Sequence, residues 1–276
     1  MIGSTSSHPA TAPLHLSDAA RAAMASSRFH DADPFPVLIL DDFLPEAFAA
    51  GLHQEILALK DLSQSNDYIF AKNKFEYPTL EAIGPHGAEL KRFLLSEEFG
   101  AALTAMYGRP LFVDANFTGG GVHRGGSGSF LDMHADFERH PGEKDWVREL
   151  NILLYMNKDW APAHGGALDL KHADTGAASA IEPLYNRLVL MLTKSFTLHG
   201  YKRTSFPPGS YRNSIAAYAY SREADEGRLA RLSTTTRWQP SDAGSVKRTI
   251  AALTPRLVRL KQRLLGSNTA RGAGKK

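Results

Sequence analysis

The sequence predicts a mainly β domain, arranged as an antiparallel sandwich or jelly roll, on three observations. Beyond residue 110 the apolar and β-branched residues come in runs of four to eight, which is the usual length of a strand. Gly, Pro, Asn and Asp separate these runs, as is typical of turns. Helical stretches are missing between the runs, which argues against the alternating βαβ order of a parallel sheet. The clearest predicted strands are residues 111–117, 150–156, 167–171, 187–193 and 214–220.

Helices are predicted on both sides of these strands. Residues 37–40 form a short apolar run suited to a buried strand, and Pro45 follows it at a typical helix start. The apolar residues after it recur at helical spacing: Phe48, Leu52, Ile56 and Leu59. A second helical stretch is predicted over residues 86–106. A third, amphipathic helix is predicted over residues 249–265, which places flanking helices at both ends of the β domain.

The 276 residues divide into three predicted parts. Residues 1–30 are expected to be a flexible leader that closes with a short helix around residues 18–24. Residues 31–222 are expected to form the β domain with its N-terminal helical support, and residues 223–276 a basic extension. The leader has no apolar segment typical of a secretory signal, and the chain has no apolar run long enough to span a bilayer. The expected location is therefore cytoplasmic.

The charge is distributed unevenly along the chain. Residues 246–276 hold nine Lys or Arg and no acid, so the net charge of +3 leaves 3 − 9 = −6 on the remainder. The basic segment has two interpretations: a terminal helix docked on the domain with a solvated basic face, or a helix lying on an anionic membrane surface through residues 246–265. Nucleic acid is not expected as a partner, because no aromatic residues alternate with the basic ones.

The absence of cysteine restricts the chemistry of any metal site. Without thiols there are no disulfides, zinc–thiolate centres or thiol nucleophiles, and His, Asp and Glu remain as metal ligands. Two histidines and one carboxylate on one face of a metal are the ligand set of non-haem Fe(II) oxygenases. In such a site a His-x-Asp motif supplies two ligands, because residues i and i+2 of a strand point to the same side.

Three His-x-acid motifs occur, although only about one is expected by chance in a chain of this composition. His53-Gln54-Glu55 lies within a predicted helix, where residues i and i+2 diverge. His172-Ala173-Asp174 enters a predicted turn and leaves only 27 residues before the last histidine, His199. His134-Ala135-Asp136 follows an apolar pair and leaves 65 residues before His199, enough for several strands. The motif His134-Ala135-Asp136 is therefore interpreted as a metal site, with His199 as the distal ligand.

Two further segments lie near this motif in the sequence. Arg212 and Ser214 open a predicted strand after His199, and side chains at i and i+2 can together bind a carboxylate by charge-assisted hydrogen bonds. Residues 119–128 contain six glycines. Because no Lys-Ser or Lys-Thr pair and no helix follows, we expect a flexible loop beside the site rather than a phosphate-binding loop.

The ordered set of these motifs resembles the 2-oxoglutarate/Fe(II) dioxygenases of the prolyl 4-hydroxylase-like group. The resemblance extends over residues 35–221, and its most similar stretches are residues 134–137, 148–160, 165–168, 186–188, 199–200 and 212–214. It implies a double-stranded β-helix, the cupin-like jelly roll, with Fe(II) held by His134, Asp136 and His199.

The resemblance also implies residues for the co-substrate. Tyr155 is expected to donate a hydrogen bond to the same 2-oxoglutarate carboxylate as Arg212 and Ser214, and Asn151 shares the inward face of its strand. The spacing from His199 to Arg212 is longer than in many relatives, which makes Arg203 a rival for the anchor.

The implied function is O₂-dependent hydroxylation of an unactivated C–H bond, with 2-oxoglutarate converted to succinate and CO₂. Arg124, Arg148 and Lys202 are candidates for the mouth of the site, where they would favour an anionic substrate; the alternative is that they are ordinary surface residues. The substrate is expected to be a small or carrier-linked metabolite, such as an amino-acid derivative or a lipid or glycan intermediate. The alternatives are a peptidyl-proline hydroxylase and a non-catalytic, cupin-like metal-binding or sensor protein.

Overall fold

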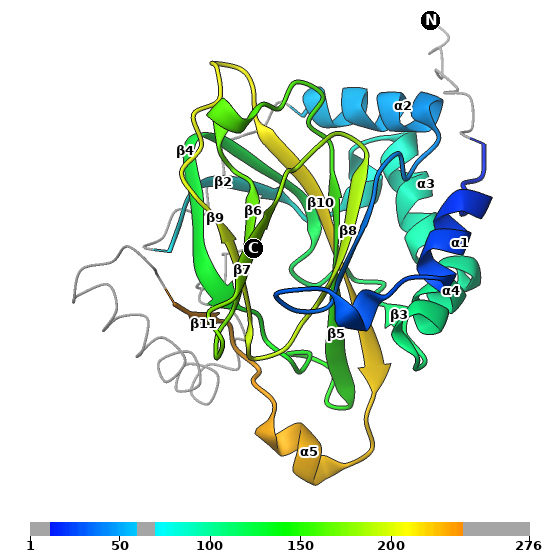
Figure 1. The fold of residues 1–276 in the computed structure, drawn as a ribbon. Helices are drawn as coiled ribbons and strands as arrows, with labels where there is room; N and C mark the ends of the chain where they lie inside the picture. Colours follow the sequence, from blue (N-terminus) through cyan, green and yellow to red (C-terminus); the bar gives the residue numbers. More distant parts are fainter. Residues whose placement is uncertain (1–11, 60–69, 240–276) are drawn as a thin grey trace, which may run out of the picture.

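The computed structural model, which describes residues 12–59 and 70–239, contains one curled antiparallel sheet with helices against one side (Figure 1). Its strands follow the spatial order β1-β8-β5-β10-β4-β9-β6-β7, and β2 and β11 pair with β4 while β3 pairs with β10. The predicted double-stranded β-helix is confirmed. The strands are β1 Val37–Leu40, β2 Ala71–Tyr77, β3 Phe112–Val113, β4 Gly121–Ala135, β5 Trp146–Tyr155, β6 Leu168–His172, β7 Ala178–Ile181, β8 Arg187–Leu192, β9 Thr197–Tyr201, β10 Arg212–Arg222 and β11 Arg237–Trp238.

The helices cover the half of the sheet formed by β1, β8, β5 and β10 (Figure 1). They are α1 Asp18–Ala25, α2 Glu46–Leu57, α3 Pro85–Leu94 and α4 Glu97–Tyr107. The short helix α5 Glu226–Arg231 follows β10 and lies apart from these four (Figure 1), and 3₁₀ turns occur at Phe29–Asp31, Leu80–Ala82 and Pro162–His164. The apolar faces of α2 and α4 pack with the strands into the main hydrophobic core. The inside of the curl is thereby left to the functional site. In the described part of the chain, no helix is long and apolar enough to cross a membrane.

Two predicted elements are shorter than expected. The helix predicted over residues 86–106 is interrupted at Ser96, whose hydroxyl accepts a hydrogen bond from the Phe99 amide and caps α4. The strand predicted over residues 111–117 ends at Val113. Asp114 then accepts hydrogen bonds from the Asn116 and Thr118 amides and turns the chain.

The glycine-rich segment is a strand and not the flexible loop that we predicted. It forms the first half of β4, which pairs with β10 on one side and with β2 on the other. Glycine is needed there because a Cβ atom at Gly121 would collide with the Tyr77 carbonyl oxygen, and the residue has a φ of +102°. Gly120 and Gly121 therefore allow a close approach of neighbouring backbones.

The predicted flexible leader is wrong for residues 12–30. The predicted short helix does exist, as α1, but Leu14, Leu16 and Met24 are buried in the main core and α1 packs against α4. At the other end, α5 and β11 of the predicted extension also pack on the domain. The amphipathic helix predicted over residues 249–265 lies outside the described residues.

Candidate active site

The three predicted metal ligands lie together at one end of the curled sheet. His134 is in β4, Asp136 follows this strand directly, and His199 in β9 pairs opposite His134. The Asp136 carboxylate oxygens lie 3.6 Å from His134 Nε2 and 3.5 Å from His199 Nε2. One ligand atom from each residue lies within 4.8 Å of the other two, which is compact enough for one metal ion. Among the described residues, this is the one group of three or more His and acidic side chains with such a geometry.

The protonation states of these groups suit a divalent cation. His134 Nδ1 donates a hydrogen bond to the Asp132 carbonyl at 2.8 Å, which leaves Nε2 as the ring nitrogen that faces Asp136. Burial lowers the pKa of His199 to about 3, and His134 lowers it further, so the imidazole is neutral. Burial alone would raise the pKa of Asp136, but Arg148 and His199 outweigh it and hold the pKa well below its usual range. The site thus offers two imidazole Nε2 atoms and one carboxylate, which is the ligand set of Fe(II).

Arg148 and Asn151 fix the Asp136 carboxylate. Arg148 Nη2 and Asn151 Nδ2 donate to Asp136 Oδ2 at 3.0 and 2.9 Å, and Arg148 also donates to the Asn151 carbonyl oxygen. The Arg148 guanidinium lies 3.4 Å from the centre of the Tyr218 ring. The prediction that Arg148 lies at the mouth is wrong, because its side chain is only 1% exposed. Asn151 likewise contacts the metal ligand Asp136, whereas we predicted a co-substrate contact.

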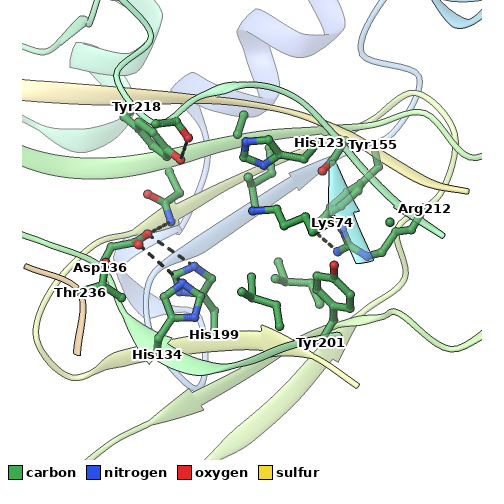
Figure 2. A pocket seen from close by; sticks show the side chains of 18 of the residues that line it. Lys74, His123, His134, Asp136, Tyr155, His199, Tyr201, Arg212, Tyr218 and Thr236 are labelled. Atoms are coloured by element: carbon green, nitrogen blue, oxygen red, sulfur yellow. Dashed lines mark hydrogen bonds and ion pairs between the residues drawn. The ribbon is translucent and has the colours of Figure 1, made fainter. Parts of the chain in front are cut away.

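The other end of the site is positively charged (Figure 2). The Arg212 guanidinium donates to the Gly166 carbonyl at 2.7 Å and to the Tyr155 hydroxyl at 3.2 Å, and lies 4.3 Å from the centre of the Tyr201 ring. Gly166 leaves room for this side chain, because a Cβ atom at that position would lie only 3.1 Å from Arg212 Cδ. Ser214 is in the same strand and pairs opposite Tyr155. A carboxylate between these groups would meet one guanidinium and two hydroxyls.

Arg203, the rival anchor, is placed elsewhere. It donates to the Gly128 carbonyl at 2.9 Å and lies over the Phe130 ring, and it does not line the cavity that contains Arg212. The exposed Lys202 does not line that cavity either. Of the two candidate arginines, Arg203 and Arg212, the geometry therefore favours Arg212 as the anchor of the 2-oxoglutarate carboxylate.

Arg124 lines the cavity but its guanidinium is already bound to protein groups. It donates to the Asn213 side-chain oxygen at 3.1 Å and to the Leu59 carbonyl at 3.0 Å, and it lies 4.2 Å from the Tyr211 ring centre. Burial lowers the pKa of this guanidinium. We assign it to holding β4 against β10, not to the substrate contact that we predicted.

One cavity of about 230 Å³ connects the metal ligands with Arg212 (Figure 2). Its lining includes residues that sequence reasoning missed: Lys74, His123, Tyr201, Tyr218, Thr236 and Trp238. Lys74 is in β2 and forms an ion pair of 3.2 Å with Glu76. His123 Nε2 is buried and has no hydrogen-bond partner among the described residues, so it is available to form a hydrogen bond with a ligand in the cavity. Burial lowers the pKa of His123 to about 3, and Lys74 lowers it further, so this ring is also neutral.

The missed residues differ in the signal that they left in the sequence. His123 alternates with Gly121 and Gly125 in β4 and would have been found had the segment been interpreted as a strand. Lys74 and Trp238 carry no motif. They reach the cavity because β2 and β11 pair with β4, and no local pattern records that pairing.

Comparison with known proteins agrees with this site. Residues 120–220 match the model of the 2OG-Fe(II) oxygenase superfamily, a range that contains all three metal ligands and Arg212. No curated protein matches the sequence. This match identifies the central part of the chain, residues 120–220, as a 2OG-Fe(II) oxygenase segment. The protein is a 2-oxoglutarate-dependent dioxygenase that uses Fe(II), 2-oxoglutarate and O₂.

Solved structures with a similar fold include a Pseudomonas putida prolyl-4-hydroxylase, at 19% identity and a TM-score of 0.50, with 78% of this chain and 98% of that chain covered. Another is a prolyl hydroxylase from Trichoplax adhaerens in complex with a hypoxia inducible factor peptide, at 19% identity, 70% and 86% coverage and a TM-score of 0.49. HygX from Streptomyces hygroscopicus, with nickel and 2-oxoglutarate bound, has 14% identity, 67% and 82% coverage and a TM-score of 0.47. At these identities the likeness concerns the fold.

Proposed function

We propose that the chain hydroxylates an unactivated C–H bond of a small or carrier-linked metabolite while 2-oxoglutarate is converted to succinate and CO₂. One observation carries the proposal: the group His134, Asp136 and His199 opens into the same cavity as the Arg212 guanidinium. A five-carbon oxo-diacid has a chelating group at one end and a carboxylate at the other. The cavity offers a partner for each end.

The roles of the residues follow from their contacts. His134, Asp136 and His199 would hold Fe(II) on one face, and the bound iron would supply the activation of O₂. Arg148 and Asn151 keep the Asp136 carboxylate charged and oriented. Arg212, Tyr155 and Ser214 bind the far carboxylate of 2-oxoglutarate, which fixes how the co-substrate lies.

The size and charge of the cavity support a small, anionic substrate group. The volume of about 230 Å³ is below the range of roughly 300–1,000 Å³ typical of ligand pockets, and 2-oxoglutarate must share it. Only a small molecule, or the end of a carrier-linked one, fits beside the co-substrate. Lys74, paired with Glu76 at 3.2 Å, lines the cavity and would take the place of Arg124, Arg148 and Lys202 as the basic residue nearest an anionic substrate.

The enzyme chemistry is tested by anaerobic titration of the metal-free protein with Fe(II) and then 2-oxoglutarate. A weak visible charge-transfer band is expected when both are bound. The band should be lost in His134→Ala and His199→Ala, which remove a metal ligand. Succinate formation that persists in either variant would contradict the ligand assignment.

The substrate proposal is tested by measuring succinate release with anionic acyl amino acids, their neutral amides and a proline-containing peptide. We expect an anionic small molecule to stimulate turnover, and Lys74→Met to remove the preference over its amide. Lys72→Met is the matched control, because Lys72 is exposed on the same strand. Stimulation by the peptide alone would support peptidyl-proline hydroxylation instead.

A further inference from the structure

We propose that Trp238 is a positioning residue for the metal ligand His134, so that the C-terminal segment is part of the metal site. The inference rests on the proposed function, because it takes His134 as a ligand of the iron. Trp238 lies 18 residues beyond the range that matches the superfamily model, since 238 − 220 = 18. The structure nevertheless places its side chain on the wall of the cavity, beside the metal-ligand group.

Three aromatic rings form a continuous stack that ends at the metal site. Trp238 is stacked on Phe70 with a centroid distance of 4.9 Å and an angle of 10°. The indole also lies 4.7 Å from the His134 ring at 30°. His134 in turn contacts the His199 ring at 4.2 Å. The imidazole of His134 is therefore packed between aromatic partners and not simply exposed to the cavity.

The position of the indole is fixed by backbone pairing around the metal-binding segment. In β11, Trp238 pairs directly opposite His134, and the Gln239 amide donates to the Met133 carbonyl at 2.7 Å. Farther along, the Glu138 and Arg139 amides both donate to the Ser233 carbonyl, at 2.8 and 3.0 Å. Residues 233–239 are thus hydrogen-bonded to the chain on both sides of Asp136.

The His134 ring needs such a contact because the torsion that rotates it, χ2, has a broad range of allowed values. One hydrogen bond, from Nδ1 to the Asp132 carbonyl, restricts the ring but leaves a tilt about that bond. The contact with the indole, inclined at 30°, restricts this tilt and keeps Nε2 directed toward Asp136, 3.6 Å from Oδ1. Outer partners that orient a metal-binding histidine typically change metal affinity by about 10–100-fold when they are removed.

The experiment measures Co(II) and Fe(II) binding by calorimetry in the full-length protein and in Trp238→Leu. We expect the affinity for both ions to fall by about 10-fold or more, with a native circular dichroism spectrum. Trp238→Phe keeps a flat ring and should restore affinity to within about threefold of the original. Trp160→Phe is the matched control, because its indole donates to the Gly165 carbonyl away from the cavity. An unchanged affinity in folded Trp238→Leu would overturn the inference.

Two spectroscopic readouts separate positioning from a purely structural role. Bound Co(II) should quench the fluorescence of Trp238 through its contact with His134, and this quenching should vanish in Trp238→Phe. The visible bands of bound Co(II) should shift in Trp238→Leu, and Trp238→Met replaces this variant if it does not fold. Bands identical to those of the original protein would contradict positioning.

A metal-ligand variant distinguishes the two possible failures. If His134→Ala binds metal normally, the ligand assignment of the proposed function fails, and the positioning inference fails with it. If His134→Ala loses metal but Trp238→Leu and Trp238→Met both retain full affinity, the positioning inference alone is wrong.

Discussion

Asp136 keeps its negative charge in a buried place because two donors, Arg148 and Asn151, point at one of its oxygens. A carboxylate in such surroundings would otherwise take up a proton and become a poor metal ligand. Arg148 is in turn held by Asn151 and by the ring of Tyr218. At the residue scale, the chemistry of the site therefore depends on side chains that need not touch the metal or the co-substrate.

Arg148→Met is expected to destabilise the protein and weaken iron binding. The substitution leaves the Asp136 charge without its main partner, and breaking a buried ion pair in this way costs about 3–5 kcal/mol. The measurement is the free energy of unfolding in urea, followed by Fe(II) titration of the folded variant. Arg222→Met is the control, since Arg222 pairs with Asp145 on the surface and should change stability by less than about 1 kcal/mol. Equal effects of the two substitutions would refute this account of Asp136.

Arg212→Ala is expected to raise the 2-oxoglutarate concentration needed for half-maximal turnover by about 10–100-fold. The reason is the loss of a charge-assisted hydrogen bond to the far carboxylate, worth roughly 1.5–3 kcal/mol. Succinate release as a function of 2-oxoglutarate measures the change. Arg203→Ala should leave the requirement unchanged, because Arg203 lies outside the cavity. A larger effect of Arg203→Ala would make that residue the anchor.

At the element scale, β4 organises the site, because it pairs with β2, β9, β10 and β11 along its 15 residues. Its glycine-rich half allows the β2 backbone to come close, and its other half carries His134. The alternation of the strand then sets which side chains enter the cavity. Loss of the β2–β4 pairing would displace Lys74 before it disturbed the metal ligands.

Gly121→Ala is expected to destabilise the protein by about 2 kcal/mol or more. A methyl group there meets the Tyr77 carbonyl oxygen, and the positive φ of the residue is strained for alanine. Thermal unfolding measures the loss. In contrast, Gly100→Ala in α4 should stabilise by about 0.5–1 kcal/mol, because its Cβ would lie 3.6 Å from the nearest atom. A stabilising effect at both positions would contradict the close approach of β2.

Glu149 in β5 connects several elements of the helix-covered half. Its carboxylate accepts hydrogen bonds from Tyr107 of α4 and Ser221 of β10, and it pairs with Lys194. Burial raises the pKa of Glu149, but Lys194 and the two hydroxyls outweigh burial, so the net pKa is lowered. The stabilisation is therefore complete above the unfolded pKa of about 4.3 and is lost as the pH falls through the folded value.

Glu149→Gln is expected to lower the free energy of unfolding by about 2 kcal/mol at pH 7, and by progressively less as the pH falls from the unfolded pKa of about 4.3 through the lower, folded pKa of Glu149. At low pH the original carboxyl is itself protonated, so the two proteins become alike. Urea unfolding at several pH values measures the difference, with Glu143→Gln as an exposed control. A difference that stays constant with pH would exclude an electrostatic origin.

At the scale of the whole molecule, the functional unit is larger than the segment that matches the superfamily model. Residues 120–220 contain the metal ligands and Arg212, but β2 and β11 lie outside this range and both line the cavity. The N-terminal helices contribute to the main core instead. Substrate selectivity and metal positioning are therefore expected to reside in β2 and β11.

We propose that the basic residues 246–276, which lie outside the described residues, bind anionic membrane surfaces. Deleting them should abolish association with vesicles that contain an anionic phospholipid, because each Lys or Arg near such a surface contributes about 1 kcal/mol. Turnover of a soluble substrate should not change. Vesicle sedimentation measures the association, with neutral vesicles as the control. Equal binding with and without the tail would favour the docked helix.

The sequence alone determined the chemistry-bearing residues and the most regular strands. His134, Asp136 and His199 were predictable because Cys was absent and only one His-x-Asp motif stood in a strand with enough chain before the last histidine. The strands β5, β8 and β10 were predictable because their apolar runs record burial on the helix-covered half. β1 was predicted as a buried strand, but Leu40 is its one buried residue.

Only the tertiary structure decided the surroundings of those residues. The strand at the glycine-rich segment and the contacts of Lys74 and Trp238 follow from pairing along β4. Arg148, which we had expected at the mouth, instead reaches Asp136 from β5. Trp238 and His134 are 104 positions apart (238 − 134) yet lie opposite each other. Local patterns report which face of an element is buried, whereas closure of the curled sheet selects which distant strands meet. That closure depends on the backbone pairing of the whole domain.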